Sequence, residues 1–196
     1  FFIQNFKHLS AGIGDGVDSI REVGYRAATD AIRALMSIKE YRRDLSLKVK
    51  TFSMELPYKP LMPLEEAKAV LEKTKEDDRQ GIPYKNALAV ADAWNHPVKK
   101  GLQYKQTIIA IGPLAAVPLP GEIFTSISLR TRAESPFQYT MLCSQSNGTN
   151  AYLTDRQAVA LGGYEVNTRI MFGPYIFVDS IDDVLVSGCL ENLNRL

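Results

Sequence analysis

The sequence has 196 residues, of which 45% are hydrophobic and 23% are charged, with a formal net charge of +1. This composition is that of a globular protein with a sizeable core, and it excludes an intrinsically disordered chain. The near-neutral charge, without a sustained run of lysine and arginine, argues against a nucleic-acid partner. No run approaches the roughly 18 apolar residues of a membrane-spanning helix.

The first residues, Phe1 to Gln4, include no initiator methionine and no basic segment, so they do not form a signal peptide. They are typical of the middle of a buried strand, and we expect the chain to be a fragment of a larger protein. A strand over 1–6 leads into a glycine-rich loop, Ser10 to Gly16. This loop lacks the Gly-Lys-Ser/Thr ending of a phosphate-binding loop and the glycine spacing of a dinucleotide fold. A plain turn is favoured there, with nucleotide binding at Gly12 to Gly16 as an alternative.

Apolar residues from Ile20 to Ile38 recur at helical spacing, which predicts a long amphipathic helix. A strand follows from Leu45, and its apolar phase reverses at Thr51-Phe52, which predicts a bulge at that point. Residues 57–100 are expected to form a helical excursion, with helices over 64–78 and 85–95, the second of which carries Trp94. Such excursions often cover an active-site face, but this one could equally be a plain insertion.

The remainder alternates between strands and helices. Strands are predicted over 104–111, 114–119 and 137–144, and helices over 121–133, 154–161 and 180–196; the almost wholly apolar strand 114–119 should be central in the sheet. The fold class is therefore α/β, a mixed sheet flanked by helices. We expect a single domain or fragment over 1–196 that forms part of a larger α/β domain.

Helix starts and stops are also marked in this second half. Glu122 directly follows Pro120-Gly121 and should lie in the first turn of the helix over 121–133. Thr154 with Gln157, and Ser180 with Asp183, resemble capping boxes, and Gly162 should end the helix over 154–161.

The cysteines and histidines do not show metal-ligand spacing. Cys143 and Cys189 are expected to be free, buried thiols, although an oxidising compartment would allow a disulfide. His96 precedes Pro97 and should be a loop residue, and His8 is a weak ligand candidate. Taken alone, the chain contains no complete catalytic triad and no complete zinc site.

Three residues remain as candidates for a functional site: Glu122, Tyr152 and Tyr164. A first-turn glutamate at position 122 can simply complement the helix dipole. Held rigidly at the end of a strand, the same carboxylate can serve as an acid/base group or as a metal ligand. The two tyrosines, from spacing alone, are equally well explained as surface or core residues.

Four segments between Gly112 and Glu165 carry a resemblance to a known family. They are Leu119-Pro120-Gly121-Glu122-Ile123-Phe124, Ser135-Pro136-Phe137, Asn147-Gly148 with Ala151-Tyr152-Leu153-Thr154, and Gly162-Gly163-Tyr164-Glu165. In this order and with these gaps, they resemble the C-terminal half of the catalytic domain of the neutral/alkaline ceramidase-type zinc amidohydrolases.

The resemblance implies that Glu122 and Tyr152 are zinc ligands and that Tyr164 lies against the substrate amide, where its phenol can donate to a developing oxyanion. It implies a metal-activated water that attacks the amide of ceramide, of another N-acyl lipid or of a small amide. Two histidines would come from the missing N-terminal half, so the chain alone would be inactive. It also implies association with a membrane surface and a secreted, periplasmic or cell-surface location.

The sequence departs from the family pattern in three places. Thr149 stands where the family often has an aromatic residue, the family's Gly-Asp-x-x-Pro loop is reduced to Gly14-Asp15-Gly16, and its substrate-side arginines and serine have no counterpart here. Asn147-Gly148-Thr149 also fits the N-glycosylation pattern, which we discount beside a metal site. The alternative function is that of a non-catalytic member, in which the fold acts as a binding or structural module.

Overall fold

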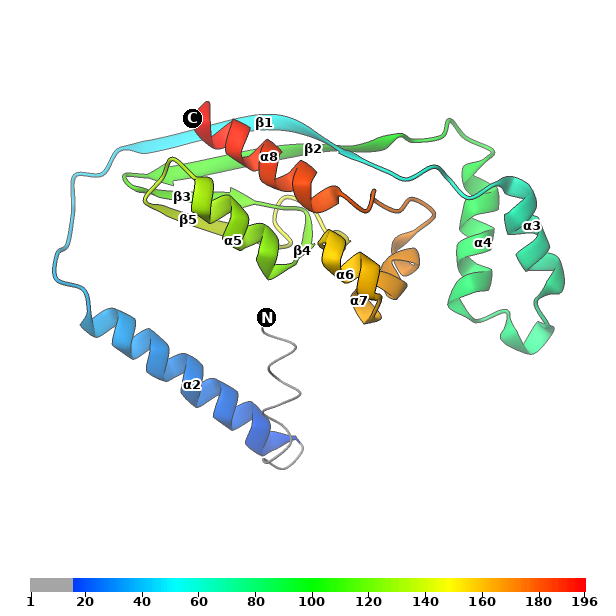
Figure 1. Cartoon of the computed structure of the whole chain (residues 1–196), viewed down its shortest axis with the longest axis horizontal. Helices are drawn as coiled ribbons and strands as arrows, with labels where there is room; N and C mark the ends of the chain where they lie inside the picture. The colour runs from blue at the N-terminus through cyan, green and yellow to red at the C-terminus, as the bar shows by residue number, and fades with distance from the viewer. Residues whose placement is uncertain (1–15) are drawn as a thin grey trace. The chain divides into compact units, whose positions relative to one another are not determined.

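A computed structural model describes residues 16–196, and contacts within the chain divide it into two units, Phe1–Leu45 and Ser46–Leu196. The predicted strand over 1–6, the loop that precedes Gly16 and His8 lie outside the described residues. The described part of the first unit contains helix α2, Val17–Met36, which confirms the predicted amphipathic helix (Figure 1). None of the α2 residues is buried. That both units belong to one domain stays a prediction.

The second unit is built on a mixed four-stranded sheet with the strand order β1-β2-β3-β5 (Figure 1). Strands β1 (Leu47–Pro57), β2 (Gly101–Ile111) and β3 (Leu114–Pro118) are antiparallel, and β5 (Tyr139–Cys143) runs parallel to β3. The predicted mixed α/β fold is confirmed, and so is the interior position of β3 in the sheet.

Strand β1 is continuous, so the bulge predicted at Thr51-Phe52 is wrong. All 11 residues of β1 pair with β2 without a shift of register. Alternate side chains of a strand point to opposite faces of the sheet. The reversed phase therefore means that the apolar residues of β1 change from one face of the sheet to the other. Leu47 and Val49 lie on one face and are exposed, whereas Phe52 lies on the other face and is buried.

Two helices cover that second face of the sheet and form the main core with it. Helices α5 (Thr125–Glu134) and α8 (Ile181–Asn194) pack against each other, as Figure 1 shows. Burial of each large apolar side chain in this core stabilises the fold by about 1.5–3 kcal/mol. The fully buried side chains at its centre are Leu56, Ile108, Val117, Leu119, Ile127, Leu153 and Leu185.

The capping box predicted at the start of α8 is not formed. Ser180 occupies the N-cap position, but its side chain makes no capping hydrogen bond. Asp183 binds arginines of two other helices instead, accepting a hydrogen bond of 2.6 Å from Arg130 and another from Arg156. These contacts join α8 to α5 and to the short helix α6 (Arg156–Leu161) at the surface.

A buried polar network crosses the core at Gln106. Its side-chain amide donates to the carbonyl oxygen of Pro118 at 3.1 Å and to the sulfur of Cys189 at 3.4 Å, and its carbonyl accepts from Asn192 at 2.8 Å. Burial raises the pKa of the Cys189 thiol to about 11, so this group stays protonated at neutral pH. Both cysteines are free, as predicted, but only Cys189 is buried, because Cys143 lies on the edge strand β5.

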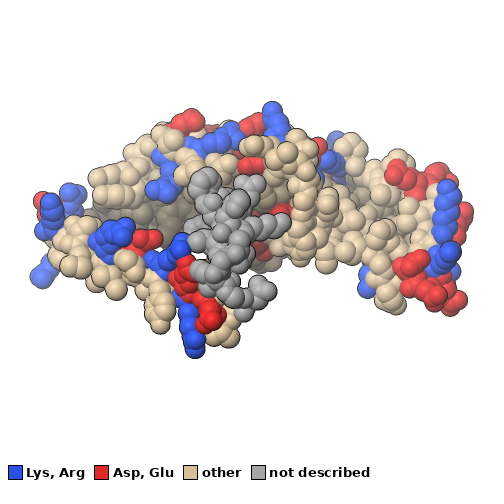
Figure 2. All heavy atoms as spheres, turned by 60° about the horizontal axis from the view of Figure 1, so that its bottom comes forward, with Lys and Arg blue, Asp and Glu red and all other residues tan. Residues whose placement is uncertain are grey.

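The expected helical excursion is a pair of helices joined by a short 3-10 turn. Helix α3 (Leu64–Lys73) is shorter than predicted, since the backbone turns extended at Thr74 and the 3-10 turn η1 (Glu76–Asp78) follows. Helix α4 spans Ile82–Ala93, and Trp94 follows it, donating from its indole nitrogen to the carbonyl of Met62 at 2.9 Å. At the tip of this hairpin, at the right of Figure 2, groups of acidic and basic side chains lie next to one another. No helix within residues 16–196 has the length and apolar character needed to cross a membrane.

Candidate functional site

Glu122 lies in a short strand and not in a helix, so its predicted helical position is wrong. Residues Gly121–Ile123 form strand β4, which pairs in parallel with β6 (Asn150–Leu153), and α5 begins only at Thr125. In this pair the direct partner of Glu122 is Tyr152. A carboxylate on a strand does not complement a helix dipole, so that explanation of Glu122 is removed.

The close approach of β4 and β6 depends on the absence of a side chain at Gly121. A Cβ atom at this position would lie 2.5 Å from the carbonyl oxygen of Ala151 and 2.9 Å from that of Asn150. Both neighbours are backbone atoms, which cannot move away without separating the strands. Gly121 therefore sets the position of the neighbouring Glu122 relative to β6.

We expect a Gly121→Ala variant of the 196-residue chain to lose about 1–3 kcal/mol of unfolding free energy, because the added methyl group overpacks the strand pair. Urea denaturation followed by circular dichroism measures the loss. Gly24→Ala on α2 is the control, since nothing lies within 4 Å of a Cβ atom there, and it should not lower the unfolding free energy because alanine favours a helix more than glycine does. A Gly121→Ala variant with an unchanged denaturation midpoint would show that the strands are not held this closely.

A tight loop after β5 holds the Glu122 carboxylate. The side-chain amide of Gln145 donates to Glu122 Oε1 at 2.9 Å, and the backbone N–H of Gln145 donates to the carbonyl of Gly121 at 3.0 Å. Gln145 and Asn147 adopt φ angles of 50° and 60°, in the left-handed region that costs side-chain-bearing residues energy. Gln145 is a site residue that the sequence did not indicate, because no local pattern marks this backbone conformation.

The rings of three aromatic residues meet beside Glu122. The Tyr152 ring lies edge to face with the Tyr164 ring at a centroid distance of 6.2 Å, and with the Phe172 ring at 6.1 Å. Tyr152 is half-buried, whereas Tyr164 is 64% exposed. The structure thus brings all three predicted site residues together and adds Phe172, at the end of the 3-10 helix η2 (Thr168–Phe172).

Two glycines position Tyr164 after the short helix α6 (Arg156–Leu161). Gly162 and Gly163 adopt φ angles of 72° and 124°, which turn the chain so that helix α7 (Tyr164–Asn167) starts at the tyrosine. The predicted stop at Gly162 is confirmed.

The predicted capping box at the start of α6 is wrong. Asp155 and not Thr154 is the N-cap, and its carboxylate accepts from the backbone N–H of Ala158 at 2.7 Å. Thr154 is buried one residue earlier, where it cannot reach the first turn of the helix.

The surroundings of Tyr152 disfavour its phenolate form. Partial burial, followed by the negative charge of Glu122, raises the pKa of the Tyr152 phenol above its ordinary value; Tyr164 and Glu165 act in the same direction. A bound cation would act in the opposite direction, because it stabilises the negative charge of a phenolate. Without a cation, the site therefore presents one carboxylate beside a neutral phenol.

This pair of oxygen donors is compatible with zinc but does not complete a zinc site. Zinc takes about four ligands, and carboxylate oxygen is among those it accepts in proteins. Within residues 16–196, no group of three or more His, Cys, Asp and Glu side chains could hold a metal ion. Of the zinc ligands that the sequence resemblance implies, the described part of the chain contains Glu122 and Tyr152, which are paired across β4 and β6.

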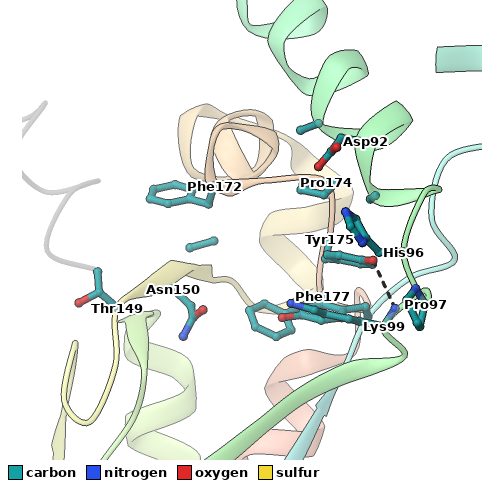
Figure 3. A pocket seen from close by; sticks show the side chains of 14 residues that line it. Asp92, His96, Pro97, Lys99, Thr149, Asn150, Phe172, Pro174, Tyr175 and Phe177 are labelled. Carbon is teal, nitrogen blue, oxygen red and sulfur yellow. Dashed lines mark hydrogen bonds between the residues drawn. The ribbon is translucent and has the colours of Figure 1, made fainter. Parts of the chain in front are cut away.

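A cleft with a volume of about 550 Å³ is lined in part by Asn150 and Ala151, the two residues that precede Tyr152 (Figure 3). Phe172 lines the cleft and its ring also contacts the ring of Tyr152, so one side chain belongs both to the cleft and to the aromatic cluster around Tyr152. The stacked rings of Tyr58 and Tyr175, whose centroids are 5.2 Å apart, line another side of the cleft. His96 lies on the rim, in the loop after α4 as predicted, and is exposed.

Comparisons with known proteins give a match at the level of the fold. No model of a protein family and no curated protein matches the sequence. The neutral ceramidase from Pseudomonas aeruginosa is similar in structure, with a TM-score of 0.52 and 17% identity over 93% of this chain and 34% of that chain. A ceramidase complexed with C2 gives a TM-score of 0.49 and 13% identity over 91% of this chain and 35% of that chain.

The chain thus spans about a third of the length of these ceramidases. The resemblance found in the sequence is confirmed at the level of structure: this chain has the fold of a part of a neutral ceramidase.

Proposed function

We propose that this chain is part of the catalytic domain of a zinc-dependent hydrolase that cleaves the amide bond of ceramide or of a related N-acyl lipid. The observation that carries the proposal is the direct pairing of Glu122 with Tyr152 across β4 and β6, with Tyr164 edge-on to Tyr152. The fold shared with a part of a neutral ceramidase supports the choice of substrate class.

In this proposal, Glu122 and Tyr152 hold the metal together with two histidines from the N-terminal half of the same protein. The chemistry supplied at such a site is polarisation of the substrate carbonyl and activation of a water molecule for attack. Gln145 fixes the orientation of the Glu122 carboxylate through its 2.9 Å hydrogen bond. Tyr164 donates a hydrogen bond to the oxygen on which negative charge develops.

The cleft beside Tyr152 is the proposed place for a part of the substrate. Its volume of about 550 Å³ falls within the range of ligand pockets, roughly 300–1,000 Å³. A lipid substrate would be met at a membrane surface. From the resemblance to the ceramidase family we also propose a secreted, periplasmic or cell-surface location.

The experiment uses the complete protein and a ceramide with a short fluorescent acyl chain, and it measures release of the labelled fatty acid. We expect the wild type to hydrolyse the amide. A Tyr164→Phe variant should lose roughly 100-fold or more in kcat, the effect of removing one oxyanion donor, while its zinc content stays unchanged. Tyr84→Phe on α4 is the matched control.

Two results would count against the proposal. If the wild type binds the ceramide but releases no fatty acid, the protein is the non-catalytic binding module that the sequence leaves as the alternative. If Tyr164→Phe hydrolyses at the wild-type rate, Tyr164 does not act on the amide.

A further inference from the structure

The face of the sheet that α5 and α8 leave uncovered carries two apolar rows, each of which crosses all four strands. The strand registers place one residue from β1, β2, β3 and β5 in each row. We call these eight residues the open face. They are Leu47, Ile111, Leu114 and Tyr139 in one row, and Val49, Ile109, Ala116 and Met141 in the other.

The outer members of both rows are well exposed. The exposed fraction is 66% for Leu47, 58% for Val49, 56% for Tyr139 and 51% for Met141. Isolated exposed apolar residues are ordinary, but a contiguous patch of this kind marks an interaction surface.

The open face has a defined border along β1 and β2. Beyond the second row, the next pair on this face is Thr51 with Thr107, whose hydroxyl groups are 2.9 Å apart. After it comes Ser53, which accepts a hydrogen bond of 2.6 Å from Lys105. An apolar centre with a polar rim is the usual anatomy of a protein–protein interface.

We propose that the open face is the surface on which the rest of the catalytic domain docks, with an apolar layer of its N-terminal half as the occupant. This inference rests on the proposed function. The choice of occupant follows from the shared fold, since 93% of this chain matches only 34% of the ceramidase chain, so most of that larger protein lies outside the matched part.

The position of the open face relative to Glu122 supports the same occupant. Strand β5, which carries Tyr139 and Met141, leads directly into the loop whose Gln145 binds Glu122. Strand β3 likewise leads to β4, so β3 and β5 both end at the candidate site. A layer docked on these strands lies beside the site that needs further metal ligands.

Hydroxyl-radical footprinting tests the proposal on the wild type. Met141 and Tyr139 should be oxidised readily in the 196-residue chain, because both are exposed, and at least 10-fold more slowly in the complete protein. Leu161, which is 74% exposed on α6, is the internal control for unchanged reactivity. Equal oxidation rates of Met141 in the two proteins would overturn the proposal.

A pair of substitutions gives a second, independent readout. Ile109→Lys should lower the thermal midpoint of the complete protein by roughly 10 °C, as expected for a charge buried in an interface. The same change should shift the midpoint of the 196-residue chain by no more than about 2 °C. Leu88→Lys, at an exposed position on α4, is the matched control and should leave both proteins unchanged.

The other occupants have distinct signatures, each of which contradicts the proposal. If a second copy is the occupant, the 196-residue chain sediments as a dimer, and Ile109→Lys converts it to a monomer. In that case Met141 is not protected from oxidation in a complete protein that is monomeric. A membrane would protect Met141 only when phosphatidylcholine vesicles are present. Zinc content and hydrolysis are measured separately from the protection of Met141. If the complete protein binds no zinc and does not hydrolyse ceramide, but Met141 is protected, the proposed function is overturned and the docking surface stands.

Discussion

A Glu122→Gln variant of the complete protein should lose amide hydrolysis by roughly 1,000-fold. The substitution keeps the size of the side chain and an oxygen that can accept the hydrogen bond from Gln145. It removes the negative charge, which is what a carboxylate ligand contributes to a cation. Tyr152→Phe should give a similar loss, because it removes the second oxygen donor of the pair. The measurement is fatty-acid release from the fluorescent ceramide.

Folding must be monitored alongside activity. Because Glu122 is exposed, we expect Glu122→Gln to change the unfolding free energy by no more than about 0.5 kcal/mol. Glu66→Gln, another exposed glutamate on α3, should retain full activity. A folded Glu122→Gln variant with wild-type hydrolysis would show that the carboxylate is not part of the catalytic site.

The largest loss of stability should come from Gln106→Leu, about 3 kcal/mol of unfolding free energy. Gln106 is 0% exposed, and its removal leaves the amide of Asn192 and the carbonyl of Pro118 without their partners in the core. A buried polar group without a hydrogen bond costs about 1–3 kcal/mol, and two such groups remain in the variant. Urea denaturation of the 196-residue chain gives the value.

The control for this prediction lies on the same strand. Gln103 is exposed on the opposite face of β2, so Gln103→Leu should change the unfolding free energy by no more than about 0.5 kcal/mol. If Gln106→Leu and Gln103→Leu have the same denaturation midpoint, the buried network does not hold β2, β3 and α8 together.

The main sheet could be predicted from the sequence because its strands are long and their apolar residues follow a clear pattern. The continuous apolar run of β3 correctly placed it in the interior of the sheet. Strand β1 shows the limit of such patterns. Its reversed phase is typical of a bulge, but here it reflects a strand with apolar residues on both faces, one of which is exposed at Leu47 and Val49.

The candidate site could be predicted only in part, because its geometry depends on contacts between distant segments. Strand β4 has three residues, too few to show a period, and it is recognised only through its pairing with β6 about 30 residues later. The sequence pattern around Glu122 therefore favours a helix. Only the resemblance to a family distinguishes Tyr152 and Tyr164 from the other tyrosines, since their spacing alone does not.

Gln145 and Phe172 were not predicted for related reasons. Gln145 reaches Glu122 through a left-handed backbone conformation, which glutamine rarely adopts and no sequence pattern announces. Phe172 reaches Tyr152 from the end of a 3-10 helix 20 residues away in the sequence. Both contacts follow from tertiary packing, which overrides local preference.

The metal content of the complete protein, purified without chelator and measured by mass spectrometry, tests the proposed site most directly. We expect about one zinc per chain in the wild type, and a loss of most of it in both Glu122→Gln and Tyr152→Phe. Zinc retained in full by folded forms of both variants, or a wild type that hydrolyses ceramide without any bound zinc, would contradict the assignment of Glu122 and Tyr152 as metal ligands.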